Sequence, residues 1–282
     1  MTQGGRGLAK TGGRRFAGGR HKGGAVMKLA VWQAASPMGD ETRAFDAIAA
    51  ALHAAGAVGC TMMVGPEAYL PGYNQDSIAA MAQGRGGAWQ QRLAGLCRAA
   101  GCGITLGYAE RAGDVVYNAA MVLDAGGAEV AQYRKLQLYG PREHSIYAPG
   151  DAYAVFDLNG VKTAVLICYD IEFPQHVAAL AAQGVALILV PTANMEPFVH
   201  VIRHTVPAMA AMTGLAIAYA NYCGIEGNLD YVGGSLVADP LGGVMAQAGK
   251  GAALLIVDGV AEVSAAQRAL MSTQAADLRV IP

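Results

Sequence analysis

Charged and aromatic residues are scarce in this sequence of 282 residues. Charged side chains make up 15% of it and aromatic ones 7%, and the formal net charge is −1. A chain so close to neutral gives no electrostatic reason to expect nucleic acid as a partner. No apolar run approaches the roughly 18 residues that are needed to cross a bilayer. We therefore expect a cytoplasmic protein whose partner is a small molecule rather than nucleic acid or a membrane.

The cysteines are few, and their spacing fits neither a disulfide framework nor a metal site. The odd set has no C-x-x-C pair and no histidine at a metal-finger distance, and its members are Cys60, Cys97, Cys102, Cys168 and Cys223. We expect four of them to be buried or free thiols in a reducing cytoplasm. Cys168 differs from the others in its sequence context.

Residues 1–26 have a composition unlike the rest of the chain. They hold nine glycines and six lysines or arginines but no acidic residue. Such a segment cannot bury enough apolar surface to offset the entropy of ordering it. We predict a disordered tail over 1–26 and a single domain over 27–282. Translation from Met27 is an alternative, and a targeting peptide or a basic arm that binds nucleic acid is less favoured.

After residue 27, strand-like apolar runs alternate with alanine-rich helical stretches. The expected strands are 28–33, 61–64, 104–110, 118–124, 129–134, 161–168, 186–190, 215–222, 235–238 and 253–257, and the expected helices are 41–56, 87–101, 174–183 and 198–213. This alternation predicts an α/β fold in which helices cover the sheets.

Three reactive side chains each follow a predicted buried strand. Glu67 ends Met-Val-Gly-Pro-Glu, Lys135 lies in Tyr-Arg-Lys-Leu-Gln-Leu-Tyr, and Cys168 lies in Leu-Ile-Cys-Tyr-Asp-Ile-Glu-Phe-Pro. Strand ends are where α/β folds usually place their sites. Taken singly, these residues would more often be a loop carboxylate, a solvated lysine and a packed thiol. Their order and their context favour a functional triad.

In these motifs the sequence resembles the nitrilase superfamily of carbon–nitrogen hydrolases, which hydrolyse amides, nitriles and carbamoyl groups with a Glu–Lys–Cys triad. Pro149-Gly150, Val190–Asn194 and Gly234-Ser235 also match, and the resemblance covers about residues 27–258. The segments 168–174, 191–195 and 220–226 resemble bacterial aliphatic amidases such as 5-aminopentanamidase.

The resemblance implies a four-layer α-β-β-α sandwich of the nitrilase type. It also implies a homodimer or a higher homo-oligomer that associates across the helices 174–183 and 198–213. Ile202, Pro207 and Met209 in the second helix could belong either to that interface or to the core. The mechanism of the family requires no metal and no organic cofactor.

The chemistry needs a base that can deprotonate a thiol. A cysteine has a pKa of about 8.5 and a glutamate one of about 4.3, so the proton transfer is uphill by roughly 5–6 kcal/mol. Burial of Glu67 and a positive charge on nearby Lys135 would narrow this gap. The resemblance implies that Lys135 and the backbone N–H of Tyr169 bind the oxyanion. It implies that Glu143 orients Lys135.

The pocket is expected to select substrates partly by charge. Relatives that act on amides bearing a carboxylate often have an arginine four positions after the nucleophile, and an arginine binds a carboxylate with two hydrogen bonds. This chain has Glu172 there, so we expect a preference for neutral or amine-bearing substrates. The alternative is that Glu172 pairs with a structural arginine. Asn194 is a further candidate for substrate binding.

Other polar residues are interpreted without a catalytic role. Four histidines lack a fitting partner spacing and are expected to be structural or at the surface, namely His144, His176, His200 and His204. Gly233-Gly234-Ser235 lacks the pattern of a serine nucleophile. Gln137 stands where many relatives have histidine.

The sequence thus predicts an enzyme that hydrolyses a small aliphatic primary amide to a carboxylate and ammonia through a cysteine thioester. A substrate like 5-aminopentanamide is favoured. A nitrilase or an N-carbamoyl-amine hydrolase is the alternative within the same chemistry. A catalytically idle interaction scaffold is the alternative from a different class.

Overall fold

The computed structural model describes Met1, residues 27–260 and Arg279. The tail predicted for residues 1–26 therefore lies outside the described residues, apart from Met1. The helices are α1 (Glu41–Ala57), α2 (Ile78–Met81), α3 (Ala88–Ala100), α4 (Gly140–Ile146), α5 (Pro174–Ala182) and α6 (Val206–Thr213). A 3₁₀-helix spans Cys168–Glu172 and a π-helical turn spans Val201–Thr205.

The strands form two sheets. The first sheet has eight strands in the order β11-β10-β1-β2-β3-β4-β5, with β14 paired to β1, and the second has six in the order β13-β12-β9-β8-β7-β6. Their bounds are β1 (Lys28–Ala35), β2 (Met62–Val64), β3 (Gly103–Ala112), β4 (Val115–Leu123), β5 (Glu129–Arg134), β6 (Ala154–Leu158), β7 (Val161–Val165), β8 (Leu187–Pro191), β9 (Ala216–Ala220), β10 (Tyr222–Glu226), β11 (Leu229–Val232), β12 (Leu236–Ala238), β13 (Val244–Gln247) and β14 (Ala253–Asp258).

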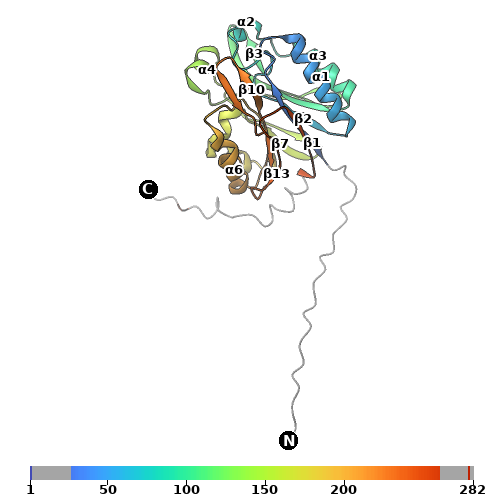
Figure 1. The fold of residues 1–282 in the computed structure, drawn as a ribbon, viewed down its shortest axis with the longest axis vertical. Coiled ribbons are helices and arrows are strands. Elements are labelled where there is room, and N and C mark those ends of the chain that lie inside the picture. Colours follow the sequence, from blue (N-terminus) through green and yellow to red (C-terminus); the bar gives the residue numbers. More distant parts are fainter. Residues whose placement is uncertain (2–26, 261–278, 280–282) are drawn as a thin grey trace.

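The two sheets pack face to face, and each has helices on its outer side (Figure 1). Alternation along β1 shows the layers, because Leu29 and Val31 belong to the cluster between the sheets, whereas Ala30 and Trp32 pack with α1 and α3. Helices α5 and α6 join the cluster of the second sheet. This is the α-β-β-α order that was predicted.

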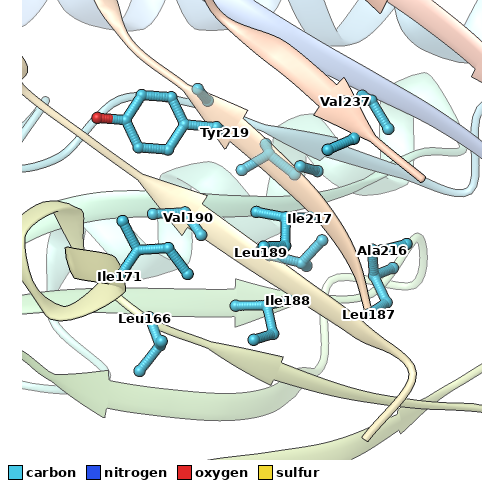
Figure 2. Close-up of a cluster of buried hydrophobic side chains, with 14 of the residues drawn as sticks. Leu166, Ile171, Leu187, Ile188, Leu189, Val190, Ala216, Ile217, Tyr219 and Val237 are labelled. Atoms are coloured by element: carbon cyan, nitrogen blue, oxygen red, sulfur yellow. The ribbon is translucent and has the colours of Figure 1, made fainter. Parts of the chain in front are cut away.

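The centre of the second sheet is buried on both faces. All five residues of β8 are buried, as are all five of the neighbouring parallel strand β9. Figure 2 shows Ile188, Val190, Ile217 and Tyr219 among these side chains. Strands covered on both sides become continuous apolar runs, which is why they were recognisable in the sequence. They form a rigid support for the loops at their ends.

Two predicted elements end differently in the structure. The strand expected over 161–168 stops at Val165, because Cys168 has a left-handed backbone with φ of 46° that no strand can accommodate. The strand expected over 215–222 divides at Asn221, so that β9 belongs to the second sheet and β10 to the first.

The helix predicted over 198–213 also differs. It is helical from Val199, passes through the π-helical turn Val201–Thr205 and becomes α-helical again at Val206. Pro207 has no backbone N–H to donate, so it fits only at the start of α6. Ile202 and Met209 are buried in the core of the chain, so a dimer interface on α6 would need exposed residues such as Met212. No helix of the described residues is both long and apolar enough to cross a membrane.

Candidate active site

The structure brings together the acidic, basic and thiol side chains that the sequence singled out. Glu67 follows β2, Lys135 follows β5 directly, Glu143 lies in α4, and Cys168 opens the 3₁₀-helix after β7. Lys135 is fully buried, and its Nζ donates hydrogen bonds to Glu67 Oε1 at 2.6 Å and to Glu143 Oε1 at 2.7 Å. Their catalytic roles remain predictions, but their proximity is a structural fact.

Glu67 is fixed by its surroundings at both carboxylate and backbone. Asn118 Nδ2 on β4 donates to Glu67 Oε1 at 2.7 Å, and the Tyr222 hydroxyl donates to the Glu67 carbonyl at 2.8 Å. Glu67 Oε2 is buried and has no hydrogen-bond partner among the described residues. One oxygen is thus anchored, and the other is available to accept a proton.

Glu143 is held as firmly on the other side of Lys135. The Tyr73 hydroxyl donates to its Oε1 at 2.7 Å, and the backbone N–H of Tyr139 donates to its Oε2 at 2.9 Å. Both of its oxygens therefore have partners, unlike those of Glu67. This arrangement suits a residue that holds Lys135 rather than one that carries a proton.

The buried charges alter one another's pKa. Burial raises the pKa of Glu67 to about 6, with Glu143 adding to the rise, although Lys135 and Asn118 oppose it. Burial alone would lower the pKa of Lys135, but Glu143 and Glu67 outweigh that effect and raise it well above its usual value. Lys135 is therefore a permanent cation, whereas Glu67 can gain or lose a proton near neutral pH.

The thiol of Cys168 is partly exposed at the turn after β7. Burial of the Cys168 side chain and the negative charge of Glu67 raise the pKa of the thiol well above its usual value, although the positive charge of Lys135 opposes this rise. Thr192 and the backbone of Ala193 also act to lower the pKa. The thiol therefore keeps its proton at rest, and a neighbouring base must remove it during attack.

A cavity of about 230 Å³ opens beside Cys168. Its lining is largely aromatic and comprises Tyr73, Tyr139, Cys168, Tyr169, Glu172, Ala193, Asn194, Met195, Phe198 and His200. All three predicted substrate-binding residues are thus present, although the Asn194 side chain donates to the Phe198 carbonyl at 3.1 Å and so also shapes the wall. His200 is exposed, as expected for a surface residue, and from the helical turn just before Val201 it also contributes to this lining.

Glu172 is half-buried in this lining. The ion pairs of the part of the chain that the structure describes do not include it, so the alternative of a structural arginine partner has no support. Burial raises its pKa, while His200 and Lys135 lower it. A carboxylate without an ion-pair partner in an apolar cavity can attract a cationic group of a ligand.

Sequence reasoning missed Asn118, Tyr73 and Asp170 as neighbours of the site. Asn118 and Tyr73 act on partners far away in the sequence, so no local motif marked them. Asp170 lies within the Cys168 motif, but two of its three partners, Tyr133 and Gln137, are distant in the sequence. Of the remaining candidates, Ser235 is buried and accepts a hydrogen bond from the Asn221 N–H at 2.8 Å. The Gln137 side chain contacts His176 Nε2 at 3.0 Å.

A buried ammonium between two carboxylates, beside a thiol at the strand ends of an α-β-β-α sandwich, defines a class of thiol hydrolases. The chain belongs to the carbon–nitrogen hydrolase family, whose model matches residues 28–268. The match extends past residue 258, where the resemblance in the sequence was expected to end. The protein is accordingly a hydrolase of carbon–nitrogen bonds.

Its relatives include amidases. A Pseudomonas protegens protein described as "Hydrolase in pqqF 5′region" is 43% identical over 199 residues, which are 69% of this chain and 70% of the relative. An (R)-stereoselective amidase of Pseudomonas sp. is 34% identical over 191 residues, covering 67% of this chain and 69% of the amidase.

A solved structure of the amidase from Nesterenkonia sp. AN1 in complex with butyramide is 33% identical and has a TM-score of 0.79. It covers 88% of this chain and 98% of its own. Another structure of that amidase shows acrylamide added at its active site cysteine. The nitrilase-type fold is therefore confirmed.

Proposed function

We propose that this protein hydrolyses a small aliphatic primary amide to a carboxylate and ammonia through a thioester on Cys168. The observation that carries the proposal is the buried Lys135 between Glu67 and Glu143, next to the thiol that faces the cavity. The amidase relatives support this reaction class, and the butyramide complex of one of them supports a short aliphatic substrate.

In the first half of the reaction, the Cys168 sulfur attacks the amide carbonyl carbon while Glu67 accepts the thiol proton. The unpartnered Glu67 Oε2 suits this role. The carbonyl oxygen becomes an oxyanion that accepts hydrogen bonds from Lys135 Nζ and the Tyr169 N–H. Two of the three N–H bonds of Lys135 point to carboxylates, so the third is free for the oxyanion. One such donor contributes about 2.7–4 kcal/mol of transition-state stabilisation.

The oxyanion then collapses and the carbon–nitrogen bond breaks. Glu67 returns its proton to the nitrogen, ammonia leaves, and the acyl group remains on Cys168 as a thioester. Glu67 next removes a proton from water, whose oxygen attacks the thioester carbon. The carbon–sulfur bond breaks, Glu67 returns the proton to the sulfur, and the carboxylic acid leaves and ionises, its proton being taken up by the released ammonia. A base whose pKa lies near neutrality serves both half-reactions.

We further propose that the cavity favours an amide with an amino group at its far end, such as 5-aminopentanamide. Glu172 supports this preference, because it adds a negative charge to an otherwise mostly aromatic wall. An ammonium group would be attracted to that carboxylate, and the free carboxylate of an ω-amide of a dicarboxylic acid would be repelled. His200 lies in the same lining and weakens this field when it is protonated.

The test compares ammonia release from 5-aminopentanamide, butyramide and the ω-amide of a dicarboxylic acid. We expect the amine-bearing amide to have the largest kcat/KM and the acidic amide the smallest. Faster turnover of the acidic amide would refute the preference. Acid, ammonia and carbon dioxide should also be measured with nitriles and carbamoyl amines, because carbon dioxide marks a carbamoyl substrate and turnover of a nitrile marks a nitrilase.

The Cys168→Ala variant separates the enzyme from an idle scaffold. It should fold normally and release no ammonia, because no other thiol lines the cavity among the described residues. Cys223→Ala is the matched control, since this buried cysteine lies outside the cavity and its substitution should leave turnover intact. Undiminished activity of Cys168→Ala would rule out the mechanism.

A further inference from the structure

Asp170 is a buried carboxylate that the mechanism above does not use. It lies two residues after Cys168 and is fully buried. It takes part in none of the ion pairs among the described residues. A buried carboxylate without a salt bridge is costly unless hydrogen bonds compensate for its lost hydration.

Three hydrogen bonds provide that compensation, and they come from two different segments. Asp170 Oδ2 accepts from the Ile167 N–H at 3.0 Å, at the residue before Cys168. The same oxygen accepts from the Tyr133 hydroxyl at 2.7 Å, and Oδ1 accepts from the Gln137 N–H at 2.7 Å. Tyr133 and Gln137 are the residues two before and two after Lys135.

One carboxylate thus connects the turn that carries the nucleophile to the segment that carries the predicted oxyanion donor. These two groups come from different sheets, because β5 belongs to the first and β7 to the second. During attack, the Cys168 sulfur must reach the carbon of the substrate carbonyl while the Lys135 ammonium reaches its oxygen. Catalytic groups must be held to within about 0.5 Å of the productive geometry. Asp170 is not among the described residues that line the cavity, so it cannot act by touching the substrate.

We propose that Asp170 is a positioning residue, whose carboxylate sets the placement of Cys168 relative to Lys135 by bridging their two segments. The inference rests on the proposed thioester mechanism. It goes beyond that mechanism in assigning part of the rate to a group that neither reacts nor binds substrate.

Tyr133→Phe and Asp170→Asn form a graded test. Tyr133→Phe removes one of the three hydrogen bonds but keeps the ring in the core and the charge on Asp170. Asp170→Asn places an NH₂ group either against the Gln137 N–H or against the Ile167 N–H and the Tyr133 hydroxyl, so at least one link becomes repulsive in either orientation. Since small displacements of catalytic groups cost up to about 100-fold in rate, we expect kcat to fall about tenfold in Tyr133→Phe and about 100-fold in Asp170→Asn. KM should not change.

Tyr108→Phe is the matched control. Tyr108 is also buried, and its hydroxyl accepts one hydrogen bond, from Gln132 Nε2 at 2.8 Å, in the cluster on the α1 and α3 side of the first sheet. It should lose as much thermal stability as Tyr133→Phe but none of its kcat. The pH profile of Tyr133→Phe should match that of the wild type, because no charge has changed. All rates are normalised to the folded fraction measured by circular dichroism.

A second readout does not depend on amide turnover. The rate at which iodoacetamide alkylates Cys168, followed by mass spectrometry, should fall in Tyr133→Phe and stay unchanged in Tyr108→Phe. If the wild type hydrolyses no amide, the proposed function fails, and alkylation still tests the positioning role. Equal kcat or equal alkylation in Tyr133→Phe and Tyr108→Phe would overturn the inference, as would a loss confined to KM or a displaced pH profile.

Discussion

The charged groups of the site lie in two regions with opposite properties. Around Lys135 the charges are sealed from water, and the side chains of Lys135, Glu67 and Glu143 are 0%, 0% and 2% exposed. At the mouth of the cavity, Glu172 is half-buried and makes no ion pair within the described part of the chain. The first region is fixed by many hydrogen bonds, and the second is lined by aromatic rings.

This difference separates chemistry from selection. A buried charge cluster cannot lose a member without leaving an uncompensated charge, so evolution can alter it only at a large cost in stability. A partly exposed carboxylate has little effect on stability, so it can be exchanged to suit a new substrate. We therefore expect changes around Lys135 to affect folding and kcat and changes around Glu172 to affect the choice of substrate.

Among changes to the charged groups of these two regions, Lys135→Met should have the largest effect on stability and turnover together. The methionine replaces the aliphatic stem but leaves Glu67 and Glu143 buried without their shared cation. Removing one partner of a buried ion pair costs about 3–5 kcal/mol, and loss of an oxyanion donor lowers kcat by about 100- to 1000-fold. Urea denaturation and ammonia release measure the two effects.

The control for this change is Lys162→Met on β7, where the side chain is exposed and, within the described part of the chain, donates to the Gln183 carbonyl alone. It should change stability by less than about 0.5 kcal/mol. If Lys135→Met were as stable as this control, Glu67 and Glu143 would not depend on Lys135 to compensate their buried charges.

The pH dependence should report on the sealed region. Burial raises the pKa of Glu67 to about 6, and Glu67 is a base only when it is ionised. The kcat/KM for neutral butyramide should therefore fall as the pH drops through 6 and approach a tenfold loss for each further pH unit. If kcat/KM instead began to fall only near the usual glutamate pKa of about 4.3, Glu67 would be solvated during the reaction. Circular dichroism over the same range excludes unfolding as the cause.

Glu172→Gln tests the other region, where we expect a change in substrate preference but not in stability. Losing one partly screened charge contact costs on the order of 1.4 kcal/mol, or about tenfold. We therefore expect kcat/KM for 5-aminopentanamide to fall about tenfold relative to butyramide, and stability to remain within about 0.5 kcal/mol of the wild type. Glu196→Gln is the matched control, because Glu196 lies outside the cavity and pairs with Lys250. An equal loss with both amides would show that Glu172 does not sense the amino group.

The two regions also differ in how far the sequence predicted them. Glu67 and Cys168 follow strands with clear apolar runs, Lys135 follows the more polar β5, and the motifs around all three are local. The partners that immobilise these groups could not be predicted in this way, because Asn118 and Tyr73 reach the cluster only through tertiary packing.

Three strands that the sequence did not predict escaped for a related reason. β6, β11 and β13 lie at the edges of their sheets and are partly exposed, so they lack a clear apolar pattern. The sequence predicted a strand up to Cys168 because the residues next to it, Ile167 and Tyr169, are apolar or aromatic. No sequence pattern reveals the left-handed φ of Cys168. His200 contributes to the cavity lining from an exposed helical turn, and its spacing along the chain gives no signal of that position.

Tyr73→Phe should have the smallest effect and tests where the two regions meet. Tyr73 lines the cavity, yet its hydroxyl donates to the buried Glu143. Glu143 keeps its bonds from Lys135 and from the Tyr139 N–H, so the loss is about 0.5–1.5 kcal/mol, or a few-fold in kcat. Tyr108→Phe is again the control. A fall in kcat with KM unchanged would place Tyr73 with the sealed cluster. A rise in KM alone would place it with the selecting wall, and the boundary between chemistry and selection would then run between Tyr73 and Glu143.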